Sequence, residues 1–343
     1  YGRTRHSPEI GALPAEAPGG GPGGPTGSPV EALRRHSLKL SQDQACQAAA
    51  ATGGATSSRP RSDSQHWFAD PAQTVIVFDW DDTLFPTGYL IDDLKLDWRQ
   101  PVSAQGHLRN SAKREVSRTL ASCERFAVEI LQRASTCGHV VVVTLAAKGW
   151  VEQACSVFYP KVGEELKRLQ IRIVNAMEYK THKSVSDASA ACRSEEEHYG
   201  LLKGRAISEE INTFYSQYEG QTWKNVLSIG DSRFERYGLL AAGTAYMSRR
   251  RLSALDIRPF SPVQRGAWTK VDEDDHVVRL RVKCCKFVDC PDMLELAIQL
   301  DMACKWLPHI VSLNEGFDLD FQALVDPSRV GIVESVLRGE RPV

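Results

Sequence analysis

The chain has 343 residues, enough for one large domain or two smaller ones, and its 42% hydrophobic and 25% charged residues are ordinary for a soluble globular protein. A formal net charge of -1 argues against charge-driven nucleic-acid binding and against a polybasic membrane anchor. No apolar run reaches the roughly 18 residues of a membrane span, and the first residues lack the apolar core of a secretory signal.

Residues 1–65 are a low-complexity arm in which Pro18–Pro29 is almost entirely Gly and Pro. Such a segment buries too little apolar surface to offset its ordering entropy, so we expect disorder, with a short helix near 30–40. Arg34-Arg35-His36-Ser37 resembles the recognition pattern of basophilic kinases and makes Ser37 a candidate phosphorylation site. Chance matches of this kind are frequent in disordered arms.

One folded domain is expected over 66–320. Near its start, Val75-Ile76-Val77-Phe78 is an apolar run with three β-branched residues, which predicts a short buried strand. Three carboxylates follow within four positions: Asp79, Asp81 and Asp82. Like charges this close repel by several kcal/mol in a low-dielectric site, so a cation or a shared proton is expected there. The alternative is a solvated acidic loop after a core strand.

Helices and strands alternate along the rest of the domain. Apolar spacing predicts helices over 107–138, 150–169 with a break at Pro160, 204–218, 234–242 and 291–311. Apolar and β-branched runs predict strands over 139–144, 171–174, 225–231, 245–247 and 278–287. Residues 88–103 and 250–275 are expected as loops, and 321–343 as a polar C-terminal tail. This alternation predicts an α/β domain with a doubly wound, mainly parallel sheet.

The 9 cysteines are odd in number and scattered through predicted helices and strands. This pattern favours reduced thiols in an intracellular, cytoplasmic protein over a disulfide framework. The cluster Cys284, Cys285 and Cys290 fits no zinc template, so we interpret these residues as parts of a strand and a loop rather than as a metal site.

Three predicted strands end in chemically useful residues: Asp79 with Asp81, Thr144, and Asp231 after a glycine. In open parallel sheets the ligand site lies beyond the carboxyl ends of the strands, so we expect these residues at one edge. Asp79 and Asp231 could hold Mg²⁺, a hard cation that binds few carboxylates and retains waters, and Glu235 could reach it directly or through water. Taken alone, an aspartate after a strand-end glycine is equally compatible with a simple turn.

If the ligand at this edge carries a phosphoryl group, a positively charged side chain is also needed to stabilise the charge of that group. The candidates are Lys148, Lys180, Lys203 and Lys224. Lys224 precedes its strand and, at about 3.3 Å per residue, lies about 20 Å from the strand end. Lys203 stands at the start of a predicted helix that must run antiparallel to the next strand, so its N-terminus returns to the site. Lys203 is therefore favoured, with Lys180 in reserve.

These motifs resemble those of a known family. Asp79-Trp80-Asp81-Asp82-Thr83-Leu84 looks like the first motif, DxDx(T/V)(L/V), of the haloacid dehalogenase-like phosphohydrolases. Thr144, Lys203 and the run from Gly230 to Glu235 resemble the other three motifs in order, so the resemblance spans 75–235. The family often has Asp where this chain has Glu235, which preserves the charge but lengthens the reach.

The resemblance implies a Mg²⁺-dependent phosphatase, a phosphoric monoester hydrolase with a Rossmann-like core. Asp79 would attack phosphorus and form an aspartyl-phosphate, while Asp81 would protonate the leaving group and then activate water. Thr144 would hydrogen-bond the phosphoryl oxygens and Lys203 would neutralise them. The implied metal ligands are Asp79, Asp231, the backbone carbonyl of Asp81 and, less directly, Glu235.

The expected partner is a phosphorylated substrate, with no nucleic acid and no membrane. Residues 85–111 are too short for a large helical cap, and 145–202 are largely used by the predicted helices and strand. A small cap or none suggests an open site, compatible with a phosphoprotein or other large substrate and also with a small phosphate ester. Trp80 is interpreted as a packing residue rather than a substrate contact, and Asp82 as a turn residue outside the chemistry.

Two other functions stay open. A catalytically silent binding or scaffold protein could have the same fold, although it would have no reason to keep Asp79, Asp81 and Asp231 together. A phosphotransferase or mutase is less favoured, because such enzymes usually need a cap that excludes water.

Overall fold

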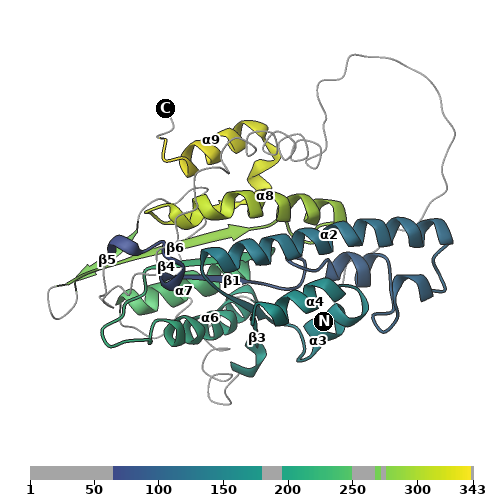
Figure 1. The fold of residues 1–343 in the computed structure, drawn as a ribbon, viewed down its shortest axis with the longest axis horizontal. Helices are drawn as coiled ribbons and strands as arrows, with labels where there is room; N and C mark the ends of the chain where they lie inside the picture. Colours follow the sequence, from purple (N-terminus) through teal and green to yellow (C-terminus); the bar gives the residue numbers. More distant parts are fainter. Residues whose placement is uncertain (1–64, 180–194, 249–266, 272–275, 341–343) are drawn as a thin grey trace.

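The computed structural model describes residues 65–179, 195–248, 267–271 and 276–340 (Figure 1). The low-complexity arm with Ser37, the reserve lysine Lys180 and most of the expected loop over 250–275 lie outside the described residues. Within the described ranges, no helix is both long enough and apolar enough to cross a membrane.

The described strands form a single sheet. They are β1 (Thr74–Phe78), β2 (His139–Thr144), β3 (Arg172–Asn175), β4 (Asn225–Gly230), β5 (Trp268–Val271), β6 (Val277–Lys286) and β7 (Phe317–Asp320). Their order is β3-β2-β1-β4-β6-β5, and β7 also pairs with β6. Every pair is parallel except β5 with β6, which is antiparallel.

Helices cover both faces of this sheet, as Figure 1 shows. They are α2 (Asn110–Cys137), α3 (Trp150–Val157), α4 (Pro160–Arg168), α6 (Glu195–Phe214), α7 (Arg233–Ser248), α8 (Met293–Ser312) and α9 (Pro327–Leu337). Side chains of β1 alternate between the two sides. Ile76 and Phe78 join the core under α2, α4 and α8, whereas Val75 and Val77 join the core under α6 and α7. A strand buried on both faces is apolar along most of its length, which explains the run Val75–Phe78.

The strand order reverses between β1 and β4, and we call the place outside the carboxyl ends of these two strands the crevice. The chain proceeds from β1 to β2 and β3 on one side, and from β4 to β6 and β7 on the other. Ligand sites of open α/β sheets lie at such a reversal, outside the carboxyl ends of the strands. The predicted doubly wound, mainly parallel α/β architecture is confirmed.

Several predicted elements differ from the structure. Residues Trp268–Val271, within the expected loop over 250–275, form β5, and Gly88–Asp93, within the expected loop over 88–103, form a helical turn. The expected strand over 245–247 is the last part of α7, where Tyr246 stacks on Trp223 with ring centroids 4.4 Å apart. The helix predicted from residue 204 already includes residues 195–203, so α6 extends further toward the N-terminus than expected. Gly204 lies inside the helix, where it allows close packing, since a Cβ on Gly238 of α7 would come within 2.9 Å of the Gly204 nitrogen.

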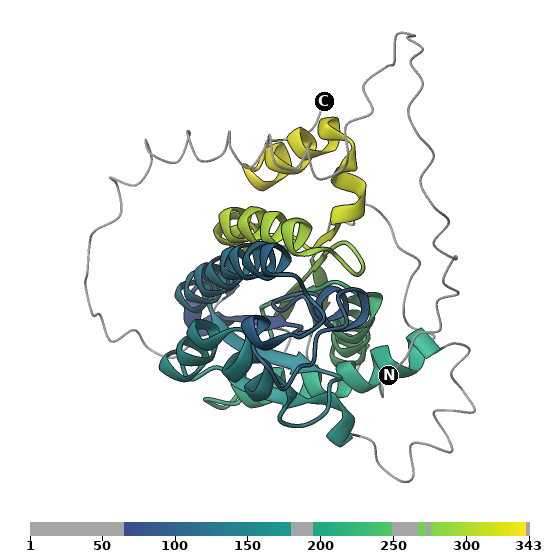
Figure 2. The same cartoon turned by 90° about the vertical axis from the view of Figure 1, so that its right-hand side faces the viewer.

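The expected polar tail over 321–343 is also wrong for most of its length. Residues Phe321–Val325 form a 3₁₀-helix and α9 follows at once. In Figure 2, α9 lies on the outer side of α8. Leu324, Val330 and Val333 are buried in the same core as α2 and α8. Apolar side chains three residues apart on a helix face are enough to extend the folded domain beyond residue 320.

Candidate active site

The predicted acidic residues meet in the crevice between β1 and β4. Asp79 directly follows β1, and its backbone N–H donates to the Ile229 carbonyl at 2.9 Å. Asp231 directly follows β4, and its N–H donates to Thr83 Oγ1 at 2.8 Å. Each backbone is thus held by the other segment, so both carboxylates are placed by the sheet itself.

Three carboxylates are close enough to share one cation. Ligand oxygens of Asp79, Asp231 and Glu235 all lie within 4.8 Å of one another. The residues are 5%, 9% and 3% exposed, respectively. Oxygen donors at this spacing suit a hard divalent cation, although acidic groups also cluster without one.

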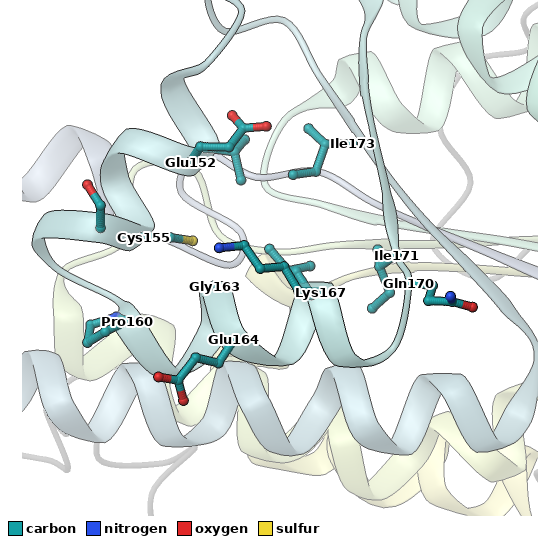
Figure 3. Close-up of a pocket in the computed structure, with 12 residues that line it drawn as sticks. Glu152, Cys155, Pro160, Gly163, Glu164, Lys167, Gln170, Ile171 and Ile173 are labelled. Carbon is teal, nitrogen blue, oxygen red and sulfur yellow. The ribbon is translucent and has the colours of Figure 1, made fainter.

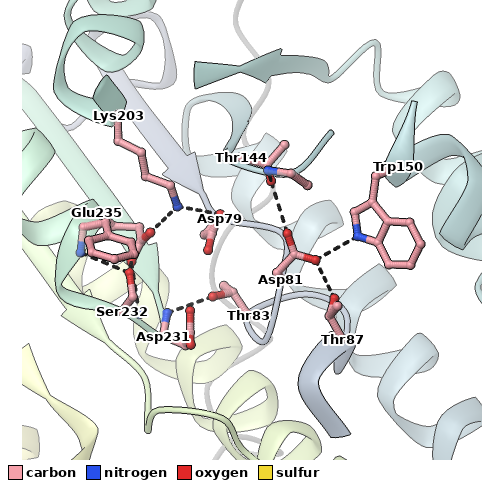
Figure 4. Close-up of polar contacts among 12 residues, drawn as sticks. Asp79, Asp81, Thr83, Thr87, Thr144, Trp150, Lys203, Asp231, Ser232 and Glu235 are labelled. Carbon is pink, nitrogen blue, oxygen red and sulfur yellow. Dashed lines mark hydrogen bonds and ion pairs between the residues drawn. The ribbon is translucent and has the colours of Figure 1, made fainter. Parts of the chain in front are cut away.

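Lys203 joins the same cluster, as Figure 4 shows. Its Nζ lies 2.7 Å from Asp79 Oδ1 and also forms an ion pair with Glu235. The side chain is 2% exposed. The lysine comes from the body of α6 rather than from its start. It reaches the site because α6 packs closely against α7, the helix that carries Glu235.

The electrostatics indicate an excess of negative charge. Burial raises the pKa of Asp79 to about 8; Lys203 opposes this shift, and Glu235 and Asp81 add to it. Burial, reinforced by Glu235 and Asp79, raises the pKa of Asp231 well above its usual value. Burial alone would lower the pKa of Lys203, but Asp79 and Glu235 reverse that effect and raise it.

The two partners of the Lys203–Asp79 pair thus shift in the same direction, which an isolated ion pair would not do. The reason is burial, which raises the pKa of Asp79 more than Lys203 lowers it, together with the count of charges: three carboxylates face one ammonium group. The lysine gains from several anions, while each acid is repelled by the others. When ionised, this set leaves two negative charges for a further cation.

Glu235 has a structural task as well. Ser232 precedes α7, and its hydroxyl accepts from the Phe234 N–H at 3.0 Å. Glu235 Oε2 accepts from the Ser232 N–H at 3.1 Å, as in a capping box. The carboxylate lies directly over Gly230, where a Cβ would stand 2.2 Å from Glu235 Cγ. Gly230 is therefore required by the position of Glu235.

Asp81 lies on the other side of Asp79, in a set of its own (Figure 4). Its Oδ1 accepts hydrogen bonds from Thr87 Oγ1 at 2.5 Å and from Trp150 Nε1 at 2.8 Å. Its Oδ2 accepts from Thr144 Oγ1 at 3.3 Å. Thr144 in turn accepts from the Ala146 N–H at 3.0 Å. The strand-end threonine predicted from sequence thus contacts Asp81.

The remaining predicted residues are placed as follows. Asp82 has φ 54° and accepts from the Gly88 N–H at 2.8 Å, which is the geometry of a turn residue. Trp80 is fully buried and stacks on Phe85, so it is a packing residue. Of the other candidate lysines, Lys148 is exposed and pairs with Glu178, and Lys224 precedes β4 at the opposite edge of the sheet. The cysteines are parts of a strand and a loop, as predicted: Cys284 and Cys285 lie in β6, and Cys290 follows it.

Thr83, Thr87 and Trp150 also belong to the site, although no role was predicted for them from the sequence. Thr83 belongs to the acidic motif, and its place between Asp82 and Leu84 is the signal that points to it. Thr87 and Trp150 offered no such signal, because they follow different strands and both donate to Asp81.

Between β1 and α2 the chain forms two short helical turns, Gly88–Asp93 and Val102–Ala104, and no large cap.

A groove of about 540 Å³ lies elsewhere, between α3, α4 and β3 (Figure 3). Its lining is mainly apolar and includes Cys155, Leu166 and Ile173. It contains none of the acidic residues of the crevice, so it is not the place where the predicted chemistry would occur.

Comparisons with protein-family models, curated proteins and solved structures found no match to this chain.

Proposed function

We propose that this protein is a Mg²⁺-dependent phosphomonoesterase that acts through an aspartyl-phosphate, as its resemblance to haloacid dehalogenase-like phosphohydrolases implies. One observation carries the proposal. Asp79, Lys203 and Asp231 come from three separate elements and converge in the crevice where the strand order reverses, with Asp81 beside them. A fold without this chemistry has no need to bury so many like charges together.

The residues present fit a divalent cation. Asp79, Asp231 and the backbone carbonyl of Asp81 would hold Mg²⁺, with Glu235 as the outer acid because Lys203 and Ser232 already engage it. The two surplus negative charges match the charge of the ion. When bound, Mg²⁺ would neutralise and orient the phosphoryl oxygens.

The chain's own groups divide the reaction into two steps. Asp79 engages Lys203 through Oδ1, and we assign Oδ2 as the oxygen that attacks phosphorus. The bond from phosphorus to the ester oxygen breaks as Asp81 gives that oxygen a proton. Asp81 then takes a proton from water, which attacks phosphorus and breaks the bond to Asp79, so inorganic phosphate leaves. Lys203 balances charge on the phosphoryl oxygens.

The substrate we propose is a phosphoprotein or another large phosphate ester. The short helical turns after β1 leave little material to enclose a small molecule. An enzyme that transfers phosphate between organic acceptors would need to exclude water from the intermediate.

The test is hydrolysis of 4-nitrophenyl phosphate by the full chain, with and without Mg²⁺, beside Asp79→Asn. We expect turnover that needs the metal and falls by about 100-fold or more in the variant. Lys203→Met should also lose turnover, whereas Lys148→Met, on the exposed surface, should not. Equal activity of the wild type and Asp79→Asn across a panel of phosphate esters would favour a binding or scaffold protein instead.

A further inference from the structure

The two oxygens of Asp81 are held very differently. Oδ1 accepts two short hydrogen bonds, from Thr87 Oγ1 at 2.5 Å and Trp150 Nε1 at 2.8 Å. Within the described residues, the side-chain hydrogen bond to Oδ2 is the longer one, 3.3 Å from Thr144 Oγ1. The carboxyl group is thus fixed through one oxygen and more lightly held through the other.

The donor on Oδ1 restricts where a proton can sit. An indole N–H only donates, whereas a threonine hydroxyl can donate or accept. Trp150 can therefore keep its hydrogen bond only while Oδ1 acts as an acceptor. A proton carried by this carboxyl group belongs on Oδ2, where the Thr144 hydroxyl can adjust to it.

The indole is held rigidly enough for this task. Gly149 has φ 85° and lets the chain turn sharply into α3, whose first residue is Trp150. The ring meets Phe85 edge-on at 6.2 Å and Trp98 at 6.2 Å. Phe85 is itself fully buried and stacked on Trp80. Edge-to-face aromatic contacts of this kind fix ring orientation as well as burying area.

We infer that Trp150 is a positioning residue, which holds Asp81 so that Oδ2 is the oxygen that exchanges protons with the leaving group. The inference rests on the proposed function, and it assigns a role to a residue whose indole N–H donates to Asp81. The proton passes from Asp81 Oδ2 to the ester oxygen as its bond to phosphorus breaks, and later returns from water to Oδ2.

The experiment compares Trp150→Phe with the wild type on two Mg²⁺-activated reactions, hydrolysis of 4-nitrophenyl phosphate and of phenyl phosphate. Phenylalanine keeps an aromatic ring and removes the N–H. Nitrophenolate leaves with little help from an acid, whereas phenolate needs the proton. General acid catalysis contributes about 10²–10⁴-fold, so we expect kcat/KM for phenyl phosphate to fall at least about tenfold more than for the nitrophenyl ester.

Three controls separate positioning from a general loss of structure. Trp98→Phe changes the neighbouring ring and should alter both substrates equally. Thr87→Val removes the other donor on Oδ1 and should repeat the selective loss even if Trp150→Phe does not fold. Adding Trp150→Phe to Asp81→Asn should cost phenyl phosphate nothing further, because Trp150 acts through Asp81.

A direct readout tests the hydrogen bond itself. With nitrogen-labelled tryptophan, the indole N–H signal that vanishes in Trp150→Phe should shift when Asp81 is changed to Leu. Equal losses on both substrates, additive losses in the double variant, or an unmoved signal would overturn the inference. Those results leave the phosphatase proposal standing if the wild type still turns over, whereas a wild type without Mg²⁺-dependent turnover defeats both.

Discussion

Replacing Gly230 with alanine should disturb the candidate site through a single contact. The three heavy atoms nearest to the added Cβ would all belong to the Glu235 side chain, Cγ at 2.2 Å and both Cδ and Oε2 at 2.4 Å. Real Cβ atoms do not approach other atoms so closely, so the Glu235 carboxylate has to move. Its ion pair with Lys203 and its bond to the Ser232 N–H would then be lost.

The size of the effect follows from these contacts. Overpacking costs about 1–3 kcal/mol, and the loss of a helix cap about 1 kcal/mol. Lys203 keeps Asp79 as a partner at 2.7 Å, so the full penalty of about 3–5 kcal/mol for an orphaned buried charge should not apply. We expect Gly230→Ala to lower the free energy of unfolding by about 3 kcal/mol.

The assay is urea denaturation of the wild type, the two single variants and the double variant Gly230→Ala with Glu235→Ala. Once the Glu235 side chain is gone, the new methyl group should fit, and Gly230→Ala should cost less than about 1 kcal/mol. Gly331→Ala is the matched control, because a Cβ there meets nothing within 4 Å and alanine favours the helix by about 0.5–1 kcal/mol. The same loss in both backgrounds would refute the reasoning.

Three further predictions concern charge. Burial raises the pKa of Asp82 to about 7, so the folded protein binds a proton that the unfolded chain releases, and stability present at low pH is lost as the pH rises toward 7. The free energy of unfolding of Asp82→Asn, relative to that of the wild type, should therefore rise by about 2 kcal/mol as the pH goes from about 5 to about 8. Denaturation at each pH measures it. Asp318→Ala, which removes the partner 2.6 Å from buried Arg236, should cost about 3–5 kcal/mol, against less than about 0.5 kcal/mol for exposed Lys148→Ala. Mg²⁺ should raise the melting temperature at about pH 8, EDTA should reverse this, and Asp231→Asn should abolish it.

Each of these three predictions has an outcome that would contradict it. An Asp82→Asn advantage that does not change with pH would mean that this carboxyl group ionises normally in the folded protein. Equal costs for Asp318→Ala and Lys148→Ala would show that burial does not decide the strength of these pairs. An unchanged Mg²⁺ effect in Asp231→Asn would place the cation away from the crevice.

The sequence by itself determined which segments form the central strands of this protein and at which edge of the sheet its acidic residues lie. Runs such as Val75–Phe78 and Val140–Val143 are too apolar for anything but strands covered on both faces, and the structure has them as β1 and the body of β2. Because parallel strands end at one edge, the positions of Asp79 and Asp231 in the sequence already implied that they would lie together. This inference needs only the direction of the strands and the period of the side chains.

Only the tertiary structure decided which side chains complete the crevice. Lys203 lies within α6, and it reaches Asp79 because the glycines of α6 and α7 let the two helices approach closely. Trp150 reaches Asp81 across the carboxyl ends of two strands, and α9 is held by burial against the core of α8. Contacts of this kind depend on how each helix is rotated and packed. That geometry is set by the whole core, whereas strand period and direction are local properties of the chain.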